Sequence, residues 1–96
     1  MDTAGSLARP KGVAVDGEGH IFVSDGLQAA IEVFGRNGEY LGVIGRRDAR
    51  DPGAGSIFEA PSGLALFGDT MIVVDGVLGL IVLQLSEPHS SSGAGG

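Results

Sequence analysis

One short pattern occurs twice in this chain of 96 residues, and it restricts what the chain can fold into. In the first copy, residues 10–25 hold two apolar runs that are separated by a Gly-rich turn and bounded by Pro, Gly and Asp. Short runs rich in Val and Ile, with turn residues between them, are typical of a β-hairpin. A similar cassette returns at residues 61–75. A hairpin that recurs along a chain indicates an architecture of repeated units.

Each hairpin continues into further strands. After strands at residues 13–15 and 21–24, the first copy has apolar runs at 31–34 and 39–44, and Asn37-Gly38 between them favours a hairpin turn. The second copy predicts strands at residues 63–66, 71–74 and 80–85. No segment shows the apolar periodicity of a helix. The sequence therefore predicts an all-β chain of two four-stranded antiparallel meanders, the second of which lacks its fourth strand.

The two copies align almost residue by residue. Three aligned pairs set the register: Gly12 with Gly63 at an offset of 51, and Asp25 with Asp75 and Ile31 with Ile81 at an offset of 50. The second copy has therefore lost one residue in the turn after its first strand, where such a change costs least.

Both faces of the predicted strands carry apolar or small residues. Strands of this kind are typical of sheets covered on both sides, so we expect Val13 and Ile21 to be buried. A sheet with two apolar faces needs a neighbour on each side, and a ring of such sheets supplies these neighbours.

The first copy also resembles a known family. It carries Pro-x-Gly-Val-Ala-Val-Asp, Gly-x-Ile-Phe-Val-x-Asp, Ile-Glu-Val-Phe and Asn-Gly-Glu-Tyr-Leu in this order, and these motifs resemble the NHL repeat. The connector Pro-Gly-Ala-Gly-x-Ile-Phe-x-x-Pro is similar to the inter-blade loop of that family. The likeness covers residues 4–85 and departs from the family pattern at Phe67 and at Gln84 and Leu85. The resemblance implies a β-propeller, commonly six-bladed, in which each blade is a four-stranded sheet.

This resemblance divides the chain into five segments. Residues 1–9 are the remnant of an inter-blade connector, 10–45 the first blade, 46–60 an inter-blade loop, 61–85 a partial second blade, and 86–96 a Ser/Gly-rich tail expected to be disordered. Two blades cannot close a ring. We therefore expect the chain to be the C-terminal two blades of a longer propeller.

The charge and composition disfavour several classes of function. The net charge is −6, and all six basic side chains lie within residues 1–51. An acidic chain without a basic stripe is a poor ligand for nucleic acid or for anionic membranes, because phosphate contacts supply most of that affinity. The chain has no Cys, which excludes disulfides and Cys-based zinc sites. The compartment is not indicated.

Several acidic residues and one histidine lie near the predicted turns. Asp16, Asp25 and Asp75 are predicted to cap turns, because an Asp carboxylate accepts hydrogen bonds from backbone N–H groups that follow it. The stretch around Asp16 faintly resembles a calcium loop but lacks the distal Glu. His20 and His89 are isolated, so neither predicts a metal site.

The connector between the copies contains a basic cluster, Arg46, Arg47 and Arg50, interrupted by acids. A solvated loop with weak local ion pairs is the simplest interpretation, and a contact surface for a phosphate or for an acidic partner is the alternative. No motif in the sequence predicts a catalytic, cofactor-binding or metal-binding residue.

The function predicted from these features is a non-catalytic protein-interaction scaffold. Its partner is another protein, the missing blades or a second copy of the chain, and neither nucleic acid nor a membrane is expected. The alternative is a fragment of a propeller enzyme, a metal-dependent lyase or lactonase-like protein, whose catalytic residues lie mostly in missing blades. RNA binding through a basic face is a third hypothesis, which the net charge disfavours.

Overall fold

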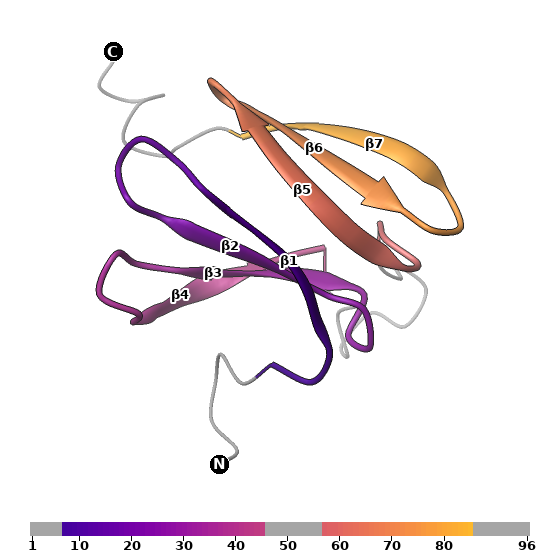
Figure 1. Cartoon of the computed structure of the whole chain (residues 1–96), viewed down its shortest axis with the longest axis horizontal. Coiled ribbons are helices and arrows are strands. Elements are labelled where there is room, and N and C mark those ends of the chain that lie inside the picture. Colours follow the sequence, from indigo (N-terminus) through magenta and orange to yellow (C-terminus); the bar gives the residue numbers. More distant parts are fainter. Residues whose placement is uncertain (1–6, 46–56, 86–96) are drawn as a thin grey trace.

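A computed structural model describes residues 7–45 and 57–85, which form two antiparallel sheets (Figure 1). Sheet A contains, in spatial order, β1 (Pro10–Val15), β2 (Ile21–Asp25), β3 (Ala30–Phe34) and β4 (Tyr40–Ile44). Sheet B contains β5 (Pro61–Phe67), β6 (Thr70–Asp75) and β7 (Gly79–Gln84). The prediction of an all-β chain with two antiparallel meanders is confirmed for the described residues. None of these residues belongs to a helix that is long and apolar enough to cross a membrane.

Turn chemistry explains where the hairpins close. Between β3 and β4, the N–H of Gly38 donates to the carbonyl of Gly35 at 2.9 Å, and Gly38 itself has φ +91°. A left-handed residue after such a turn favours Gly, which has no Cβ to strain. The turn predicted from Asn37-Gly38 therefore forms at these residues.

The predicted one-residue loss in the first hairpin of the second copy is confirmed. Five residues separate the paired Val15 and Ile21, whereas four separate the paired Leu66 and Met71. The longer loop also carries its own hydrogen bonds, since the N–H of Gly19 donates to the carbonyl of Asp16 at 3.2 Å.

The predicted register of the third strand is wrong by one residue. Asp25 pairs with Ala30 in sheet A, but Asp75 pairs with Gly79 in sheet B, because the turn after β6 is one residue shorter. Ile81 therefore corresponds to Glu32 and not to Ile31. A slip of one residue moves a side chain to the opposite face of a strand.

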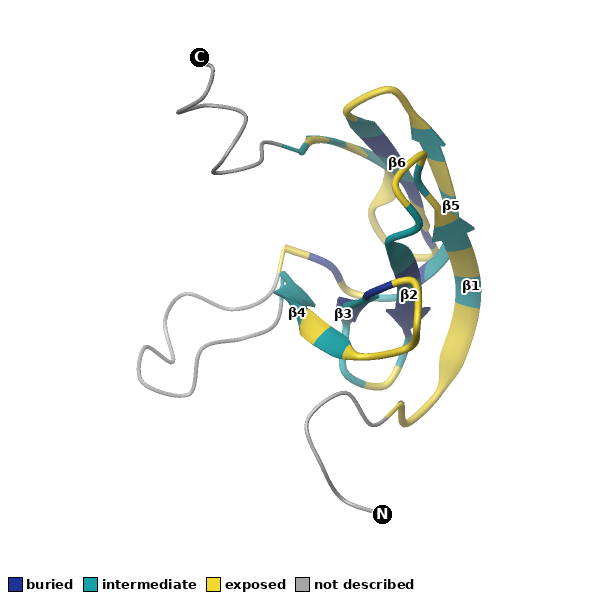
Figure 2. Cartoon of the chain, turned by 90° about the vertical axis from the view of Figure 1, so that its left-hand side faces the viewer, coloured by how far each residue is buried: buried dark blue, intermediate teal, exposed yellow. Residues whose placement is uncertain are grey.

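The core lies between the two sheets and takes opposite faces from them. It is formed by Phe22, Ile31, Phe58, Met71 and Val73, none more than 6% exposed. Met71 and Val73 of β6 align with Ile21 and Val23 of β2, which point away from the core. The core residue Phe22 aligns with Ile72, which lies on the opposite face of β6 from Met71. The sheets therefore pack head to tail, the front of one on the back of the next. Figure 2 shows the two sheets coloured by the burial of their residues.

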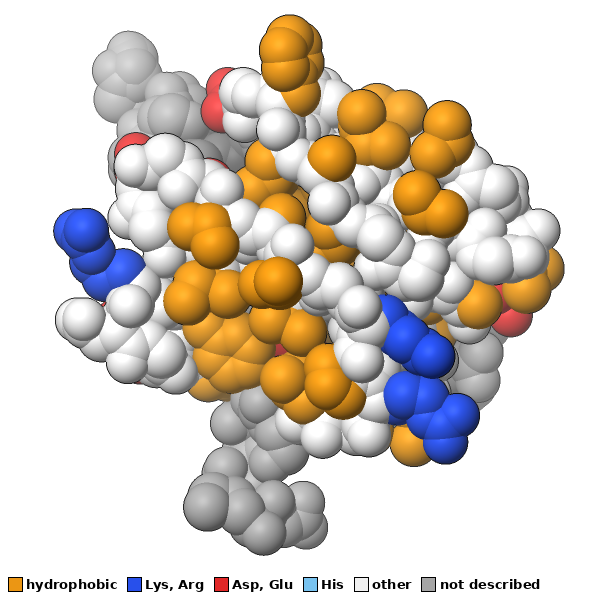
Figure 3. All heavy atoms as spheres, viewed as in Figure 1, with side chains coloured by type: hydrophobic (Ala, Val, Ile, Leu, Met, Phe, Trp, Pro, Cys, Tyr) orange, Lys and Arg blue, Asp and Glu red, His pale blue; other side chains and the backbone are white. Residues whose placement is uncertain are grey.

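This packing leaves one largely apolar face of each sheet with no second sheet packed on it among the described residues. We call them the outer face of sheet A (Val13, Val15, Ile21, Val23, Glu32, Phe34 and Val43) and the outer face of sheet B (Ala65, Phe67, Ile72, Val74, Leu80 and Val82). Figure 3 shows hydrophobic side chains gathered over both sheets. Such contiguous apolar surface is characteristic of interaction sites.

The prediction that Val13 is buried is wrong, because this side chain lies on the outer face of sheet A and is 62% exposed. Ile21, on the same face, is half-buried. Glu32 also belongs to this face but is only 1% exposed, and its Oε1 has no hydrogen-bond partner among the described residues. A buried carboxylate oxygen without a donor is energetically unfavourable.

One buried hydroxyl joins the two sheets where β1 and β5 approach each other. Ser24 accepts a hydrogen bond from the N–H of Gly12 at 2.9 Å and donates to the carbonyl of Ser62 at 2.5 Å. A Cβ at Gly12 would meet the same carbonyl oxygen. Gly12 therefore permits the close approach of the backbones.

We expect Gly12→Ala to lower the free energy of unfolding by about 2 kcal/mol, because the added methyl group forces the two sheets apart. Denaturant unfolding followed by circular dichroism measures this change. Gly17→Ala is the matched control: nothing lies within 4 Å of its Cβ position, so its stability stays unchanged or rises slightly. Equal losses in the two variants would contradict the close approach at Gly12.

Candidate functional site: the cleft between the two sheets

A cleft of about 510 Å³ opens between the sheets at the end where the β1–β2 loop and the β5–β6 turn lie. Its walls are apolar and come from both sheets: Phe22, Val33 and Ile44 from sheet A, and Leu83 and Leu85 from the end of sheet B. A concave apolar surface with a few polar groups is the usual form of a binding site. The cleft is therefore the best candidate site in the described part of the chain.

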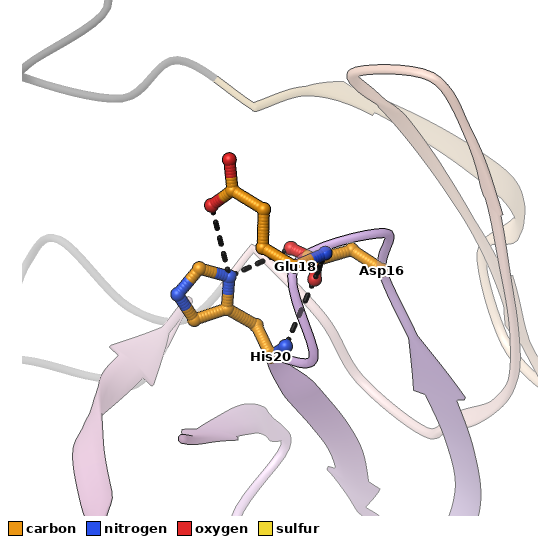
Figure 4. A network of polar contacts seen from close by, with 3 residues as sticks. All are labelled: Asp16, Glu18 and His20. Carbon is orange, nitrogen blue, oxygen red and sulfur yellow. Dashed lines mark hydrogen bonds and ion pairs between the residues drawn. The ribbon is translucent and has the colours of Figure 1, made fainter. Parts of the chain in front are cut away.

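The polar rim of the cleft includes a carboxylate–imidazole pair, Asp16 and His20, drawn in Figure 4. The Nδ1 of His20 lies 2.8 Å from Oδ2 of Asp16, and Oδ1 of Asp16 accepts the backbone N–H groups of Glu18 and His20 at 2.9 and 2.8 Å. Glu18 Oε1 lies 3.8 Å from the same ring nitrogen. The loop thus holds the imidazole in one orientation at the rim.

Burial alone raises the pKa of the Asp16 carboxyl, but the hydrogen bonds from the ring and the backbone of His20 and from the backbone of Glu18 outweigh it and lower this pKa. Asp16 is therefore ionised at neutral pH. Together with Asp69 in the β5–β6 turn, which also lines the cleft, it makes the rim acidic.

The sequence predicts a turn cap for Asp16 and no metal site for His20, and it does not predict that the two residues pair. Asp16 was expected to cap its turn, and it does accept two turn N–H groups. The available signal was the four-residue spacing across a Gly-rich turn, which brings the two ends of the loop together. The structure adds that both residues border an apolar cleft.

The other two predicted turn residues, Asp25 and Asp75, lie in equivalent and fully enclosed positions. Asp75 is 3% exposed, and its carboxylate accepts four backbone N–H groups at 2.9–3.0 Å. Two of these groups belong to the turn after β6, and two belong to Glu59 and Ala60, which precede β5. Each aspartate therefore both caps its turn and holds the entry of the sheet in place.

The same arrangement is present around Asp25 in sheet A. Its carboxylate accepts the N–H groups of Ala8 and Arg9 before β1 and those of Leu27 and Gln28 in the turn, at 2.6–3.2 Å. This repeated cage joins the entry of the first strand to the turn after the second strand through a buried carboxylate.

Burial alone raises the pKa of Asp75, but the four N–H donors outweigh it and lower this pKa to about 2. The pKa of Asp25 is lowered in the same way. A pKa that is lower in the folded state than the unfolded value of 3.8 means that the ionised carboxylates stabilise the folded state. This stabilisation is present above about pH 4 and is lost as the pH falls towards about 2.

We expect the free energy of unfolding to fall as the pH drops from about 4 to about 2, as these carboxylates become protonated. Urea unfolding at a series of pH values measures this loss. In Asp75→Asn, which cannot be protonated, the fall over this range becomes smaller. An unchanged pH profile in that variant would contradict the role given to Asp75.

The remaining candidates lie in segments that the structure does not describe. Arg46, Arg47 and Arg50, the predicted loop contact surface, lie outside the described residues, as do His89 and the predicted tail. No group of three or more His, Cys, Asp or Glu side chains suited to a metal ion occurs within residues 7–45 and 57–85.

Comparisons with models of known protein families and with curated proteins find no match for this chain. The resemblance to NHL repeats therefore stays a prediction.

Proposed function

We propose that this chain consists of blades of an NHL-like β-propeller and acts as a non-catalytic protein-interaction scaffold. The observation that carries the proposal is the head-to-tail packing of the sheets, the front of sheet A on the back of sheet B. Further sheets can extend this packing. The outer face of sheet A is equivalent to the core face of sheet B, and the outer face of sheet B is equivalent to the core face of sheet A. A ring of blades satisfies all such faces.

The exposed side chains support an interaction role. On the outer face of sheet B, Val74 is 47%, Leu80 70% and Val82 64% exposed, and none of these positions is polar. The partner for such a face is another apolar protein surface: a further blade, a second copy or a different protein. The net charge of −6 argues against nucleic acid and anionic lipid as partners.

We expect the purified chain to self-associate in a concentration-dependent way, because a second copy offers the complementary outer face. Light scattering coupled to size exclusion measures this. The double variant Val74→Lys and Leu80→Lys should shift the sample towards monomer without loss of strand content. Leu27→Lys, at a 66% exposed position in the β2–β3 turn, is the matched control and should associate as the unmodified chain does.

A sharp, cooperatively melting monomer of 9.7 kDa at high concentration would contradict self-association through the outer faces. Stoichiometric calcium or zinc in the purified protein would contradict the non-catalytic scaffold, because it would favour the metal-dependent propeller enzyme instead.

A further inference from the structure

We propose that the open edge of β7 is a docking site for an extended peptide of a partner protein, which adds to sheet B as a fourth strand and fills the cleft. This inference rests on the interaction role proposed above and gives that role a specific site. Its occupant has alternating apolar side chains and a basic residue near its amino-terminal end.

The first argument is the hydrogen-bonding edge of β7, which pairs with no strand among the described residues. The pairing of β6 with β7 is unbroken from Thr70–Gln84 to Asp75–Gly79, and the N–H of Leu85 donates to the carbonyl of Asp69 at 2.7 Å. Alternate residues of an antiparallel strand point their main-chain groups to opposite sides. The N–H and C=O groups of Leu80, Val82 and Gln84 therefore point away from β6.

Sheet A has a fourth strand, β4, at the position that corresponds to this edge. There β3 lies between β2 and β4, whereas β7 has a strand neighbour on one side only among the described residues. An unpaired edge of this kind is a template for strand addition by another chain. Because all strand pairs in both sheets are antiparallel, the peptide runs antiparallel to β7.

The cleft supplies the second argument, because it lies along the same edge. Leu83 and Leu85 form its wall on the β7 side, and Leu41 and Ile44 of β4 form the opposite wall. A strand added to β7 projects every second side chain towards β4, since successive side chains alternate between the two faces. The apolar walls therefore select apolar residues at alternate positions of the peptide.

Charge supplies the third argument and sets the direction. The acidic rim, Asp16 and Asp69, lies at the end of the cleft where β7 finishes. An antiparallel strand begins opposite the end of β7, so the amino-terminal residues of the peptide lie beside this rim. A Lys or Arg at that end complements the carboxylates, and the acidic chain as a whole attracts a basic partner.

The test uses the whole chain and a fluorescent synthetic peptide of about seven residues with the pattern Lys-Thr-Val-Thr-Val-Thr-Val. Fluorescence anisotropy should show saturable binding. Methylation of the peptide nitrogens that face β7 should weaken binding by more than about tenfold, because it removes main-chain hydrogen bonds and keeps every side chain. Moving the Lys to the carboxyl-terminal end should weaken binding by about threefold or more, because the Lys then no longer lies beside the carboxylates of the acidic rim.

Two protein variants test the edge itself. Val82→Pro removes one N–H group that points away from β6, a place where an edge strand tolerates Pro, and should lose binding. Val82→Thr keeps the N–H and the β-branched shape, and should bind like the unmodified chain. If Val82→Pro fails to fold, the methylated peptide still decides the question.

Absence of saturable binding, or equal binding of the methylated peptide, would overturn the docking site. Equal binding by a folded Val82→Pro variant would do the same. These outcomes are separable from the scaffold proposal, because self-association through the outer faces is measured without peptide and depends on Val74 and Leu80. Association without peptide binding would reject the strand site alone.

Discussion

Replacing Phe58 with Ala is expected to lower the free energy of unfolding by about 3–5 kcal/mol, the largest effect of any substitution considered for this chain. Phe58 is 1% exposed and packs between the sheets with the core residues of both, including Phe22 and Met71. Its ring also lies against Gly45, where a Cβ would come within 2.5 Å of the ring. Truncation therefore removes a shared core side chain and leaves a cavity that neither sheet can fill alone.

Thermal and urea unfolding measure this loss, and the chain provides a matched control for it. Phe67→Ala removes the same atoms from a side chain that is 80% exposed on the outer face of sheet B, so its effect should stay within about 0.5 kcal/mol. Losses of similar size in the two variants would contradict the placement of Phe58 in the core.

Replacing Asp75 with Ala is expected to cost about 3 kcal/mol, because four backbone N–H groups lose a shared charged acceptor inside an enclosed turn. Sheet B then loses both its β6–β7 turn and the connection to Glu59 and Ala60 before β5. Hydrogen exchange should show faster exchange at these N–H groups as well as a lower melting temperature.

The control for Asp75→Ala is Glu59→Ala. The Glu59 side chain is exposed, and its contribution to the cage is a main-chain N–H that Ala retains. Glu59→Ala changes the net charge by the same amount as Asp75→Ala but removes no acceptor from the cage. The difference between the two variants therefore measures the loss of the acceptor. A loss in Glu59→Ala as large as that in Asp75→Ala would show that net charge, and not the cage, accounts for the effect.

The strands were predictable because their determinants are local. Runs of Val, Ile and Leu of strand length lie between Gly, Asn and Asp residues that close turns, and the strands form where these patterns predicted them. The register of β7 was not predictable, because the sequence after Asp75 is compatible with turns of two lengths. One length aligns Ile81 with Ile31 and the other aligns it with Glu32. Pairing with β6 decides it.

The candidate site was only partly predictable. The turn-capping chemistry of Asp16 follows from its own sequence neighbours, and the four-residue spacing allows its pairing with His20. The position of this pair at the rim of a cleft depends on how the two sheets pack. Phe58 stands in a segment that the sequence assigned to a loop, and nothing local distinguishes it from the exposed Ile57 beside it.

The sequence by itself determined the strands, the turns and the repetition of the unit, because hydrogen bonding and backbone conformation act over a few residues. Only the tertiary structure decided which face of each sheet is covered, since both faces are apolar and local preference cannot choose between them. Packing of one sheet on the other makes that choice: it buries Phe58, exposes Val13, and opens the cleft beside β7.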